Sequence, residues 1–374
     1  MTNSITADPQ SNFRLISLDV LRGIIMILLC AESCRVYESI KHLGPSGLAG
    51  GLVNQFFHHP WHGLHFWDLV QPAFMFMAGS AMYISYSRKL AKGSSWSANF
   101  KHILVRCLRL FICGVGLHCI YAGKPVWELW NVLTQLAFTT LIAYLIINRS
   151  YAFQIGFSIG LLLLTEFLYR TVLMPGFSQP FVEGQNFGSY MDTIFMGKIN
   201  SDGWVAINII PTAAHTIWGV LAGKLLISDR NSAYKLKALV VAGIFALILG
   251  HGLDLLNITP IIKRISTSAF ALASGGWVLL LLAAVYWIVD IKKNQRYAWI
   301  ATVMGMNAIF IYLFFETVGM QWVNGAVDVF SGQMLHLFLG VPEAIAAVVS
   351  ALLTLLLEWG LCYWLYNRGI FFKL

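Results

Sequence analysis

Long apolar runs separated by short polar turns repeat along almost the whole chain. A run of about 20 apolar residues matches the thickness of the bilayer core when it forms a helix. We place ten such helices, at residues 20–38, 66–87, 102–121, 128–147, 151–173, 205–227, 236–256, 267–290, 298–319 and 343–366. The pattern therefore predicts an all-α polytopic membrane protein with about ten transmembrane helices.

The polar segments outside these runs are short. Residues 1–13 form a polar N-terminal tail without the apolar core of a signal peptide, so we expect the first helix to direct the chain to the membrane. Residues 14–374 would then form a single transmembrane domain. The longest connecting segments are 39–65, 174–204 and 320–342. They are too short to bury cores of their own, and we expect them to form lids over the membrane domain.

Basic residues gather in alternate turns between the predicted helices. One set of turns carries most of them, including Arg88, Lys89, Lys92, Lys292 and Lys293. An excess of Lys and Arg marks cytoplasmic turns. We therefore expect both termini in the cytoplasm and the stretch around residue 58 on the outer face.

Composition agrees with a membrane protein. The 374 residues are 58% hydrophobic and 11% charged, with a mean hydropathy of +0.69, which excludes a water-soluble globule. The formal net charge of +8 is spread over short turns rather than gathered in one patch, so we expect no nucleic-acid partner. The six cysteines lie mostly in apolar runs and form no CxxC pair, which predicts neither a disulfide framework nor a zinc knuckle.

Four imidazoles, His58, His59, His62 and His65, precede the second apolar run, and the carboxylate of Asp68 lies just inside it. Polar groups concentrated at one membrane face indicate a functional site. Metal binding is one alternative, because His58, His62 and His65 have the spacing of one helical face. Pro60 argues against it, since a helix that begins at a proline leaves His58 outside. Interfacial packing is a second alternative, and the favoured hypothesis is catalysis by one imidazole without a metal.

Four further ionisable residues lie inside apolar runs, namely His118, His215, Glu316 and Glu358. Exposure of such groups to lipid is costly, so we expect each to face the bundle interior or a wet cavity.

Charged residues also mark the cytoplasmic end of the bundle. Asp19 and Arg22 stand three residues apart at the start of the first helix, so they share a face and can pair. Arg22 is also placed to meet an anionic group that enters from the cytoplasm, together with Arg106 and Arg109 near the start of the third helix.

Several motifs, in order from about residue 14 to residue 320, resemble those of the heparan-alpha-glucosaminide N-acetyltransferases of lysosomes and their bacterial relatives. The motifs are Arg14-Leu15 with Ser17-Leu18-Asp19-Val20-Leu21-Arg22-Gly23, His58-x-x-Trp61-x-Gly63-Leu64 with Asp68-Leu69-Val70-x-Pro72, Ser189-Tyr190-Met191-Asp192 with Gly197, Gly219-Val220-Leu221-Ala222-Gly223-Lys224, Pro260-x-x-Lys263, and Gly305-Met306-Asn307 with Glu316. This family moves acetyl from acetyl-CoA to an amino sugar across a membrane.

The resemblance implies a role for individual residues. The first histidine of the active-site motif is the family's proposed catalytic residue, and it falls on His58. The family's supporting asparagine is replaced here by Ser33 beside Glu32, so we expect Glu32, Ser33, Trp61 and Asp68 to support His58.

The resemblance also implies two binding regions. Acetyl-CoA would bind at Asp19, Arg22, Arg106 and Arg109, and its thioester would reach His58 through the bundle. The sugar would bind at the family-motif residues Tyr190, Asp192, Lys263, Asn307 and Glu316, which topology sends to the outer half.

Taken together, the resemblance predicts a multi-pass acyltransferase of a bacterial inner membrane, without the luminal N-terminal domain of the lysosomal enzyme. Its partners would be acetyl-CoA, a glucosamine-type sugar and the lipid bilayer, and a homodimer is left open. His58 would act as general base or acyl carrier, and the sequence does not decide between them. The alternative is a sugar permease of the inner membrane with its solute near the midplane. No repeat relates the two halves of the chain, which argues against transport.

Overall fold

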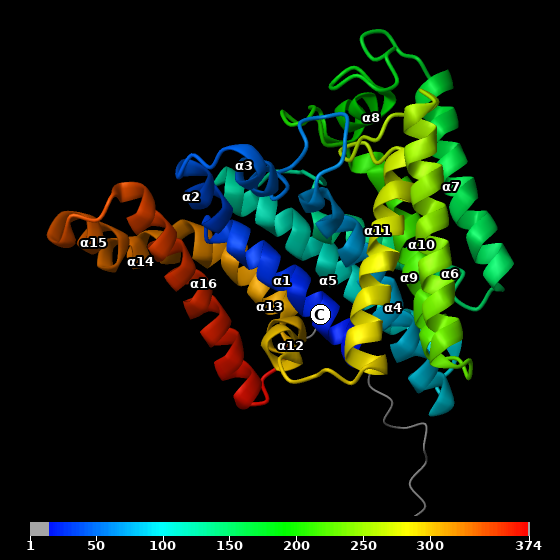
Figure 1. Cartoon of the computed structure of the whole chain (residues 1–374). Helices are drawn as coiled ribbons and strands as arrows, with labels where there is room; N and C mark the ends of the chain where they lie inside the picture. Colours follow the sequence, from blue (N-terminus) through cyan, green and yellow to red (C-terminus); the bar gives the residue numbers. More distant parts are fainter. Residues whose placement is uncertain (1–14, 373–374) are drawn as a thin grey trace, which may run out of the picture.

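The computed structural model describes residues 15–372, so the predicted tail 1–13 and Arg14 of the first motif lie outside the described residues. Helices packed side by side make up this part of the chain, as Figure 1 shows, and no β-strand forms within it. The prediction of an all-α fold is therefore confirmed for the described residues.

Each of the ten predicted apolar runs contains helix. The first five runs correspond to α1 (Ile16–Ser33), α4 (Val70–Ala91), α5 (Trp96–Ala122), α6 (Val132–Leu145) and α7 (Tyr151–Thr171). The other five correspond to α9 (Ile209–Leu226), α10 (Ser232–Leu255), α11 (Ser268–Tyr286), α12 (Ala298–Met306) followed by α13 (Ala308–Phe314), and α16 (Glu343–Asn367).

Shorter helices extend or connect these elements. The extensions are η1 (Phe66–Leu69), η2 (Ala206–Asn208) and the π-helices η3 (Trp287–Ile291) and η4 (Phe315–Val323); the connecting helices are α2 (Val36–His42), α3 (Gly47–Asn54), α8 (Phe187–Met196), α14 (Asn324–Phe330) and α15 (Gly332–Leu339). In Figure 1, α2, α3 and α8 lie over one end of the bundle, whereas α14 and α15 project sideways beyond α16. The expectation of a lid at 320–342 was therefore wrong, because these helices extend outward from the side of the bundle.

Six helical segments of the described chain are long and apolar enough to cross a membrane, and a seventh arises if two helical segments that meet at a bend of 72° beside Asn307 form one span. The six are Trp96–Ala122, Tyr151–Thr171, Ala206–Leu226, Ser232–Leu255, Ser268–Ile291 and Glu343–Asn367. Among the remaining helices, α1 carries three charged residues within its 18, and α6 has only 14 residues. The structure is that of a polytopic membrane protein, while the ten-span topology with both termini in the cytoplasm stays a prediction.

Glycines allow pairs of helices to approach closely. A Cβ atom on Gly23 of α1 would lie 1.8 Å from the carbonyl oxygen of Ala301 in α12, and one on Gly219 of α9 would lie 2.0 Å from that of Phe76 in α4. Small residues bring helix backbones together in membrane proteins. The glycine of the 219–224 motif therefore has a packing role.

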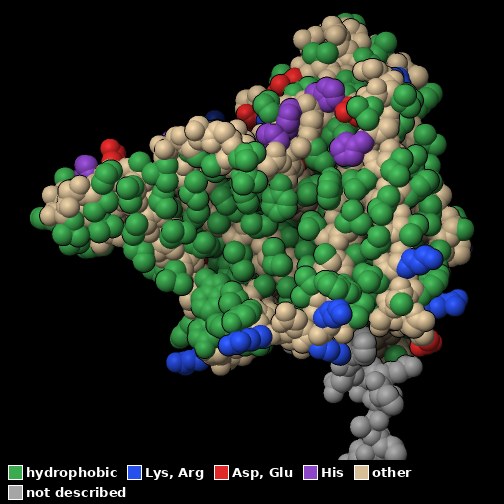
Figure 2. Space-filling model, viewed as in Figure 1, with side chains coloured by type: hydrophobic (Ala, Val, Ile, Leu, Met, Phe, Trp, Pro, Cys, Tyr) green, Lys and Arg blue, Asp and Glu red, His purple; other side chains and the backbone are tan. Residues whose placement is uncertain are grey.

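The two ends of the bundle differ in charge. Figure 2 shows Lys and Arg side chains gathered near the end of the bundle at which α1 begins in Figure 1, histidines near the opposite end, and hydrophobic side chains between them. The interior also holds polar groups as predicted, since His215 and Glu358 are fully buried. The His58 end and the cationic end are described in turn below.

Candidate active site

Two loops far apart in the sequence meet at one end of the bundle. His62 and Ile262 form an isolated antiparallel bridge, and the Gly63 amide donates to the Ile261 carbonyl at 2.9 Å. The Asp254 carboxylate contacts both loops, because its Oδ1 lies 2.7 Å from His62 Nε2 and accepts from the Ile261 amide at 2.9 Å. This pairing brings Lys263 beside His58.

His58, Asp68 and Lys263 form a compact polar group. Nδ1 of His58 lies 3.0 Å from Asp68 Oδ1 and 2.9 Å from Lys263 Nζ, while Nζ lies 3.4 Å from the same Asp68 oxygen. The other Asp68 oxygen accepts from the backbone amides of His59 and His65, at 3.2 and 2.8 Å. Asp68 is thus fixed by four partners, and it fixes one edge of the His58 ring.

The two contacts of His58 Nδ1 correspond to two tautomers. Nδ1 either donates its proton to Asp68 or accepts one from the Lys263 ammonium, because a ring nitrogen has one in-plane position. When Nδ1 donates to Asp68, Nε2 carries the lone pair and can act as a base. The His58 side chain keeps 39% of its surface exposed, so its ring is open to a substrate.

Burial and neighbouring charges decide the protonation of this group. Burial and the charge of Lys263 lower the pKa of His58 below its ordinary 6.5, although Asp68 acts in the opposite direction. Burial also lowers the pKa of Lys263 from 10.5 to about 8, despite the attraction of Asp68. At neutral pH the arrangement therefore holds a neutral imidazole beside a protonated lysine.

A tryptophan that the motifs did not indicate covers this group. The Trp204 ring meets His58 edge to face with centroids 6.1 Å apart, and Lys263 Nζ lies 5.3 Å from the centre of the same ring. Trp61, predicted as a supporting residue, donates its Nε1 proton to the Phe181 carbonyl at 2.8 Å and packs against Gly203. Trp61 therefore positions the loop that carries Trp204, and its indole N–H is directed to Phe181 rather than to His58. An isolated tryptophan in a polar loop gave no signal in the sequence.

The end of α1 contributes Glu32, whereas Ser33 points elsewhere. Glu32 accepts a hydrogen bond from Nε1 of Trp67, the residue directly before Asp68, at 2.9 Å. The Glu32 carboxyl is also close enough to interact electrostatically with Lys263 and Glu316. The Ser33 hydroxyl donates to the Phe315 carbonyl at 3.2 Å. The structure thus brings Glu32 to the site but not Ser33, whose hydroxyl is directed toward η4.

Glu316 and Tyr190 lie at the same end of the molecule. Glu316 in η4 accepts from the Tyr121 hydroxyl at 2.6 Å. Tyr190 in α8 packs its ring against Phe177 and belongs to the same apolar cluster as Trp61. Both residues thus have protein partners near the His58 end of the bundle, and sugar binding by them stays a prediction.

Asp192 is a buried structural carboxylate. It is fully buried, and it accepts from Trp130 Nε1 at 2.7 Å and from the Ala206 amide at 2.9 Å. Burial raises its pKa to about 6. Because Ala206 follows Trp204 by two residues, Asp192 holds the loop that covers His58, and its oxygens face protein donors rather than an open cavity.

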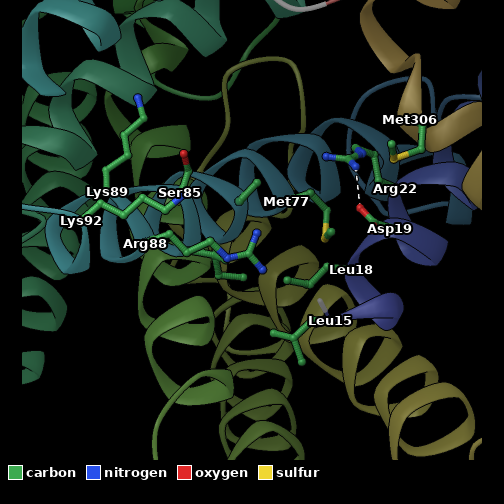
Figure 3. Close-up of a pocket in the computed structure, with 12 residues that line it drawn as sticks. Leu15, Leu18, Asp19, Arg22, Met77, Ser85, Arg88, Lys89, Lys92 and Met306 are labelled. Carbon is green, nitrogen blue, oxygen red and sulfur yellow. Dashed lines mark hydrogen bonds and ion pairs between the residues drawn. The ribbon is translucent and has the colours of Figure 1, made fainter. Parts of the chain in front are cut away.

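The cationic end contains two adjoining cavities of about 730 and 370 Å³ that share Arg22 and Lys89. The larger one is also lined by His102, Arg106 and Arg109. In the smaller one, drawn in Figure 3, Arg22 pairs with Asp19 at 2.7 Å. Its remaining cations are Arg88, Lys89 and Lys92. The structure thus gathers all four residues predicted to bind acetyl-CoA, and volumes of this size suit a ligand.

Asn307 lies at this cationic end, and its expected place beside the sugar was therefore wrong. Its amide nitrogen donates to the Ile370 carbonyl at 3.0 Å, and its oxygen accepts from the Phe372 amide at 3.1 Å. Its neighbour Met306 and Phe372 both line the larger cavity. Asn307 anchors the end of the described chain against the wall of that cavity.

The remaining histidines of the stretch have separate partners. Residues 57–65 are not helical, and η1 begins only at Phe66, so the expected helix start near Pro60 was wrong. His62 pairs with Asp254, while His65 Nδ1 bonds the Phe57 carbonyl at 2.9 Å. The three imidazoles of the metal alternative therefore do not share a helical face.

Comparison with known proteins gives one family. The sequence model described as "Heparan-alpha-glucosaminide N-acetyltransferase, catalytic" matches residues 14–258, which is more than half of the chain. No curated protein matches the sequence. The matched residues include α1, the His58 stretch and α9, whereas Lys263, Asn307 and Glu316 follow the matched region.

Proposed function

The chain belongs to the heparan-alpha-glucosaminide N-acetyltransferase catalytic family, a family of transmembrane acetyltransferases, and from this membership we propose the reaction that it catalyses. It transfers acetyl from cytoplasmic acetyl-CoA to the amino group of a glucosamine-type sugar at the outer face of a bacterial inner membrane. His58 is the general base or the acyl carrier. The geometry of His58 with Asp68 and Lys263 is the observation that carries this proposal.

The cationic cavities suit the nucleotide part of acetyl-CoA. The diphosphate and the 3′-phosphate are anionic, and guanidinium groups such as Arg22, Arg106 and Arg109 bind phosphate oxygens with fixed geometry. Lys89 adds a further positive charge to both cavities. Acetyl-CoA would therefore bind with its nucleotide at this end and its thioester directed along the bundle.

The distance to the opposite end suits an extended pantetheine arm. Arg22 lines the cationic cavities, while Glu32, ten residues further along α1, lies at the His58 site. Ten residues of helix correspond to about 15 Å. The arm would pass Gln71 and Gln135, whose side-chain amides hydrogen-bond to each other. Gln71 precedes Phe74 by three residues and Gln135 directly precedes Leu136, and both Phe74 and Leu136 line the larger cationic cavity.

Two chemical routes use the same His58 geometry. In the first, Nε2 takes a proton from the sugar ammonium, and the freed amine attacks the thioester while CoA leaves as a thiolate that is then protonated. In the second, Nε2 attacks the thioester first, CoA leaves, and the amine displaces acetyl from the ring. In both, Nδ1–H donates to Asp68 and stabilises the positive charge that the ring acquires.

The alternative function, a sugar permease, would not use acetyl-CoA. An acetyltransferase consumes the thioester and acetylates glucosamine in detergent solution, whereas a permease does neither. The assay on the purified chain is release of CoA that depends on both acetyl-CoA and the amino sugar.

Substitution His58→Ala tests the role of the imidazole. We expect acetyl transfer to fall by about 10²- to 10⁴-fold if His58 is a general base, and further if it carries the acyl group. The side chain is partly exposed, so its loss should leave the bundle folded. Binding of acetyl-CoA, measured in parallel, should be unchanged.

His62→Ala is the matched control, because His62 lies on the same loop and pairs with Asp254 instead. It should keep turnover close to that of the unmodified protein. Near-normal turnover of His58→Ala would contradict the proposal.

A further inference from the structure

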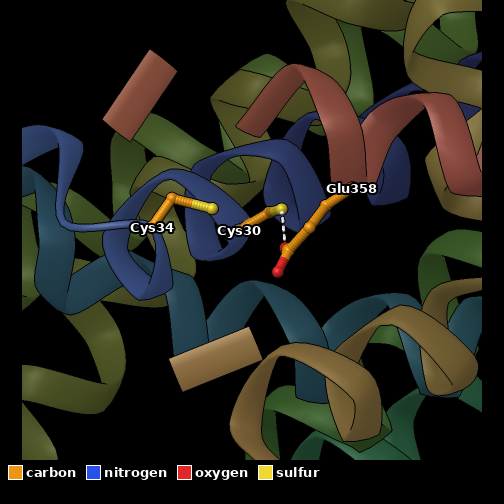
Figure 4. A group of neighbouring side chains, drawn as sticks. All are labelled: Cys30, Cys34 and Glu358. Atoms are coloured by element: carbon orange, nitrogen blue, oxygen red, sulfur yellow. Dashed lines mark hydrogen bonds between the residues drawn. The ribbon is translucent and has the colours of Figure 1, made fainter. Parts of the chain in front are cut away.

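Three ligand-type side chains meet inside the bundle, away from the His58 site. Cys30 lies in the last turn of α1, Cys34 is the residue that caps its C-terminal end, and Glu358 comes from α16, as Figure 4 shows. Their sulfur and oxygen atoms lie within 4.8 Å of one another, and Cys30 Sγ is 2.8 Å from Glu358 Oε2. All three residues are buried, with exposed fractions of 0%, 3% and 0%.

One oxygen of this group has no partner in the protein. The Cys30 thiol satisfies Glu358 Oε2, but Oε1 is buried without a hydrogen bond. A buried carboxylate that lacks a partner is costly. Oε1 faces Gly319 of η4, where an added Cβ atom would lie only 2.6 Å away. The hydrogen bond from the Cys30 thiol therefore leaves Oε1 of Glu358 without a partner, and Gly319 leaves space beside this oxygen.

We propose that Cys30, Cys34 and Glu358 bind a soft d¹⁰ metal cation, Cu⁺ or Zn²⁺. Thiolates select these ions, and a buried negative charge is tolerated when it coordinates a metal. Metal–sulfur bonds are about 2.3 Å long and metal–oxygen bonds about 2.0–2.2 Å. Small side-chain shifts would bring the three ligand atoms to the separations that such bonds require. On binding, the thiol protons leave and the cation takes their place.

The two cations differ in the number of ligands that they require. Three ligands suffice for Cu⁺, whereas structural Zn²⁺ is four-coordinate. Cys362 follows Glu358 by one helical turn on α16 and is fully buried, so it offers a further thiol for a fourth position.

Such an ion would join two parts of the chain. Cys30 and Cys34 lie within residues 14–258 that match the family, and Glu358 lies outside them. The metal would therefore attach α16 to the end of α1, next to Glu32 at the His58 site. This role is structural and does not depend on the proposed reaction. It departs from our expectation of a metal-free protein, because ligands 328 residues apart form no sequence motif.

Metal content of the full chain tests the proposal. Protein purified in detergent is incubated with Zn²⁺, or with Cu⁺ under reducing conditions, and then separated from free metal in the presence of a weak chelator. We expect one equivalent of one of these ions in the unmodified protein, and its loss in Cys30→Ser and Glu358→Gln. Cys107→Ser, which removes a buried cysteine of α5 outside the group, should keep it.

A spectroscopic measurement on the unmodified protein covers the case in which a variant fails to fold. Co²⁺ bound to thiolates gives a charge-transfer band in the near ultraviolet, and we expect this band to titrate to one equivalent. The proposal is overturned if the unmodified protein holds no more metal than Cys30→Ser, if Cys107→Ser loses as much, or if the cobalt band is absent.

Discussion

Nδ1 of His58 faces two partners that require opposite tautomers. Donation to Asp68 leaves Nε2 free to act as a base, whereas donation by Lys263 places the proton on Nε2. The Lys263 ammonium can donate to Asp68 instead, at 3.4 Å. In the proposed mechanism, a small movement of the Lys263 side chain would therefore switch His58 between a tautomer that can act as a base and one that cannot.

Lys263 should also set the pH at which His58 becomes protonated. Its positive charge lowers the pKa of His58, so Lys263→Met should raise that pKa toward the ordinary value of 6.5. The proposed mechanism requires neutral His58, so activity should be lost as the pH falls through its pKa. The acidic limb of the kcat/KM profile should therefore move to higher pH in Lys263→Met.

Lys263→Arg keeps the charge and is the matched control. Its acidic limb should stay where it is in the unmodified protein. An unchanged limb in Lys263→Met would show that Lys263 does not act on His58 through its charge.

Some residues of the site could be predicted from sequence motifs and others could not. His58, Asp68 and Lys263 stand in motifs, and the structure brings these three together. Trp204 lies in a loop without a motif, and its position depends on the bond between Asp192 and the Ala206 amide. The position of Asn307 could not be predicted from its motif, because the motif does not indicate its hydrogen-bond partners. These partners, Ile370 and Phe372, belong to the C-terminal segment.

At the scale of elements, the break between α12 and α13 holds the end of the chain against the larger cationic cavity. Asn307 makes two hydrogen bonds to residues 370–372, and Phe372 stacks on Phe310 with ring centroids 4.8 Å apart. Asn307→Ala removes both bonds, each worth about 1 kcal/mol. Together they correspond to about 2 kcal/mol, so we expect the KM for acetyl-CoA to rise by up to about 30-fold. The KM for the sugar should change little.

Two variants check this assignment. A chain that ends after Gly369 lacks the anchored segment and should reproduce the raised KM for acetyl-CoA. Asn324→Ala removes a hydrogen bond from a side-chain amide to the Ser33 carbonyl elsewhere in the bundle, and it should leave the KM for acetyl-CoA unchanged. Equal changes in both KM values for Asn307→Ala would point to a general loss of packing.

Hydropathy predicted the long helices, since each apolar run became helix. It did not predict the short helices α2, α3, α8, α14 and α15, which are not long enough to give a membrane-spanning signal. The π-helix η4 was also missed, although its wide turns direct Glu316 to Tyr121 and Gly319 to Glu358. A short π-helical segment produces no recognisable periodicity of hydrophobic residues in the sequence.

For the whole molecule, the charge difference between the two ends predicts its orientation in the membrane. The excess of basic residues predicts that the cationic end faces the cytoplasm. Single cysteines at exposed positions test this, because Ser46 lies at the start of α3 near the His58 end and Ser97 at the start of α5. Ser46→Cys should react from outside with an impermeant thiol reagent in intact cells, and Ser97→Cys should not.

Both variants should react after the membrane is opened, which confirms that each position is accessible. The unmodified protein, whose cysteines lie within the described bundle, gives the background. Labelling of Ser97→Cys from outside would overturn the predicted orientation.

The hydrogen bond between Gln71 and Gln135 has a consequence for a membrane that carries a voltage. A water-filled cationic cavity would confine most of the voltage drop to the remaining partition toward His58, in which these amides lie. In the proposed reaction the phosphates of CoA stay on one side of this partition, and only uncharged groups, the pantetheine arm and its acetyl thioester, pass it. Acetyl transfer would then involve almost no electrical work, so the enzyme could run at the same rate in a fully energised membrane and in a discharged one.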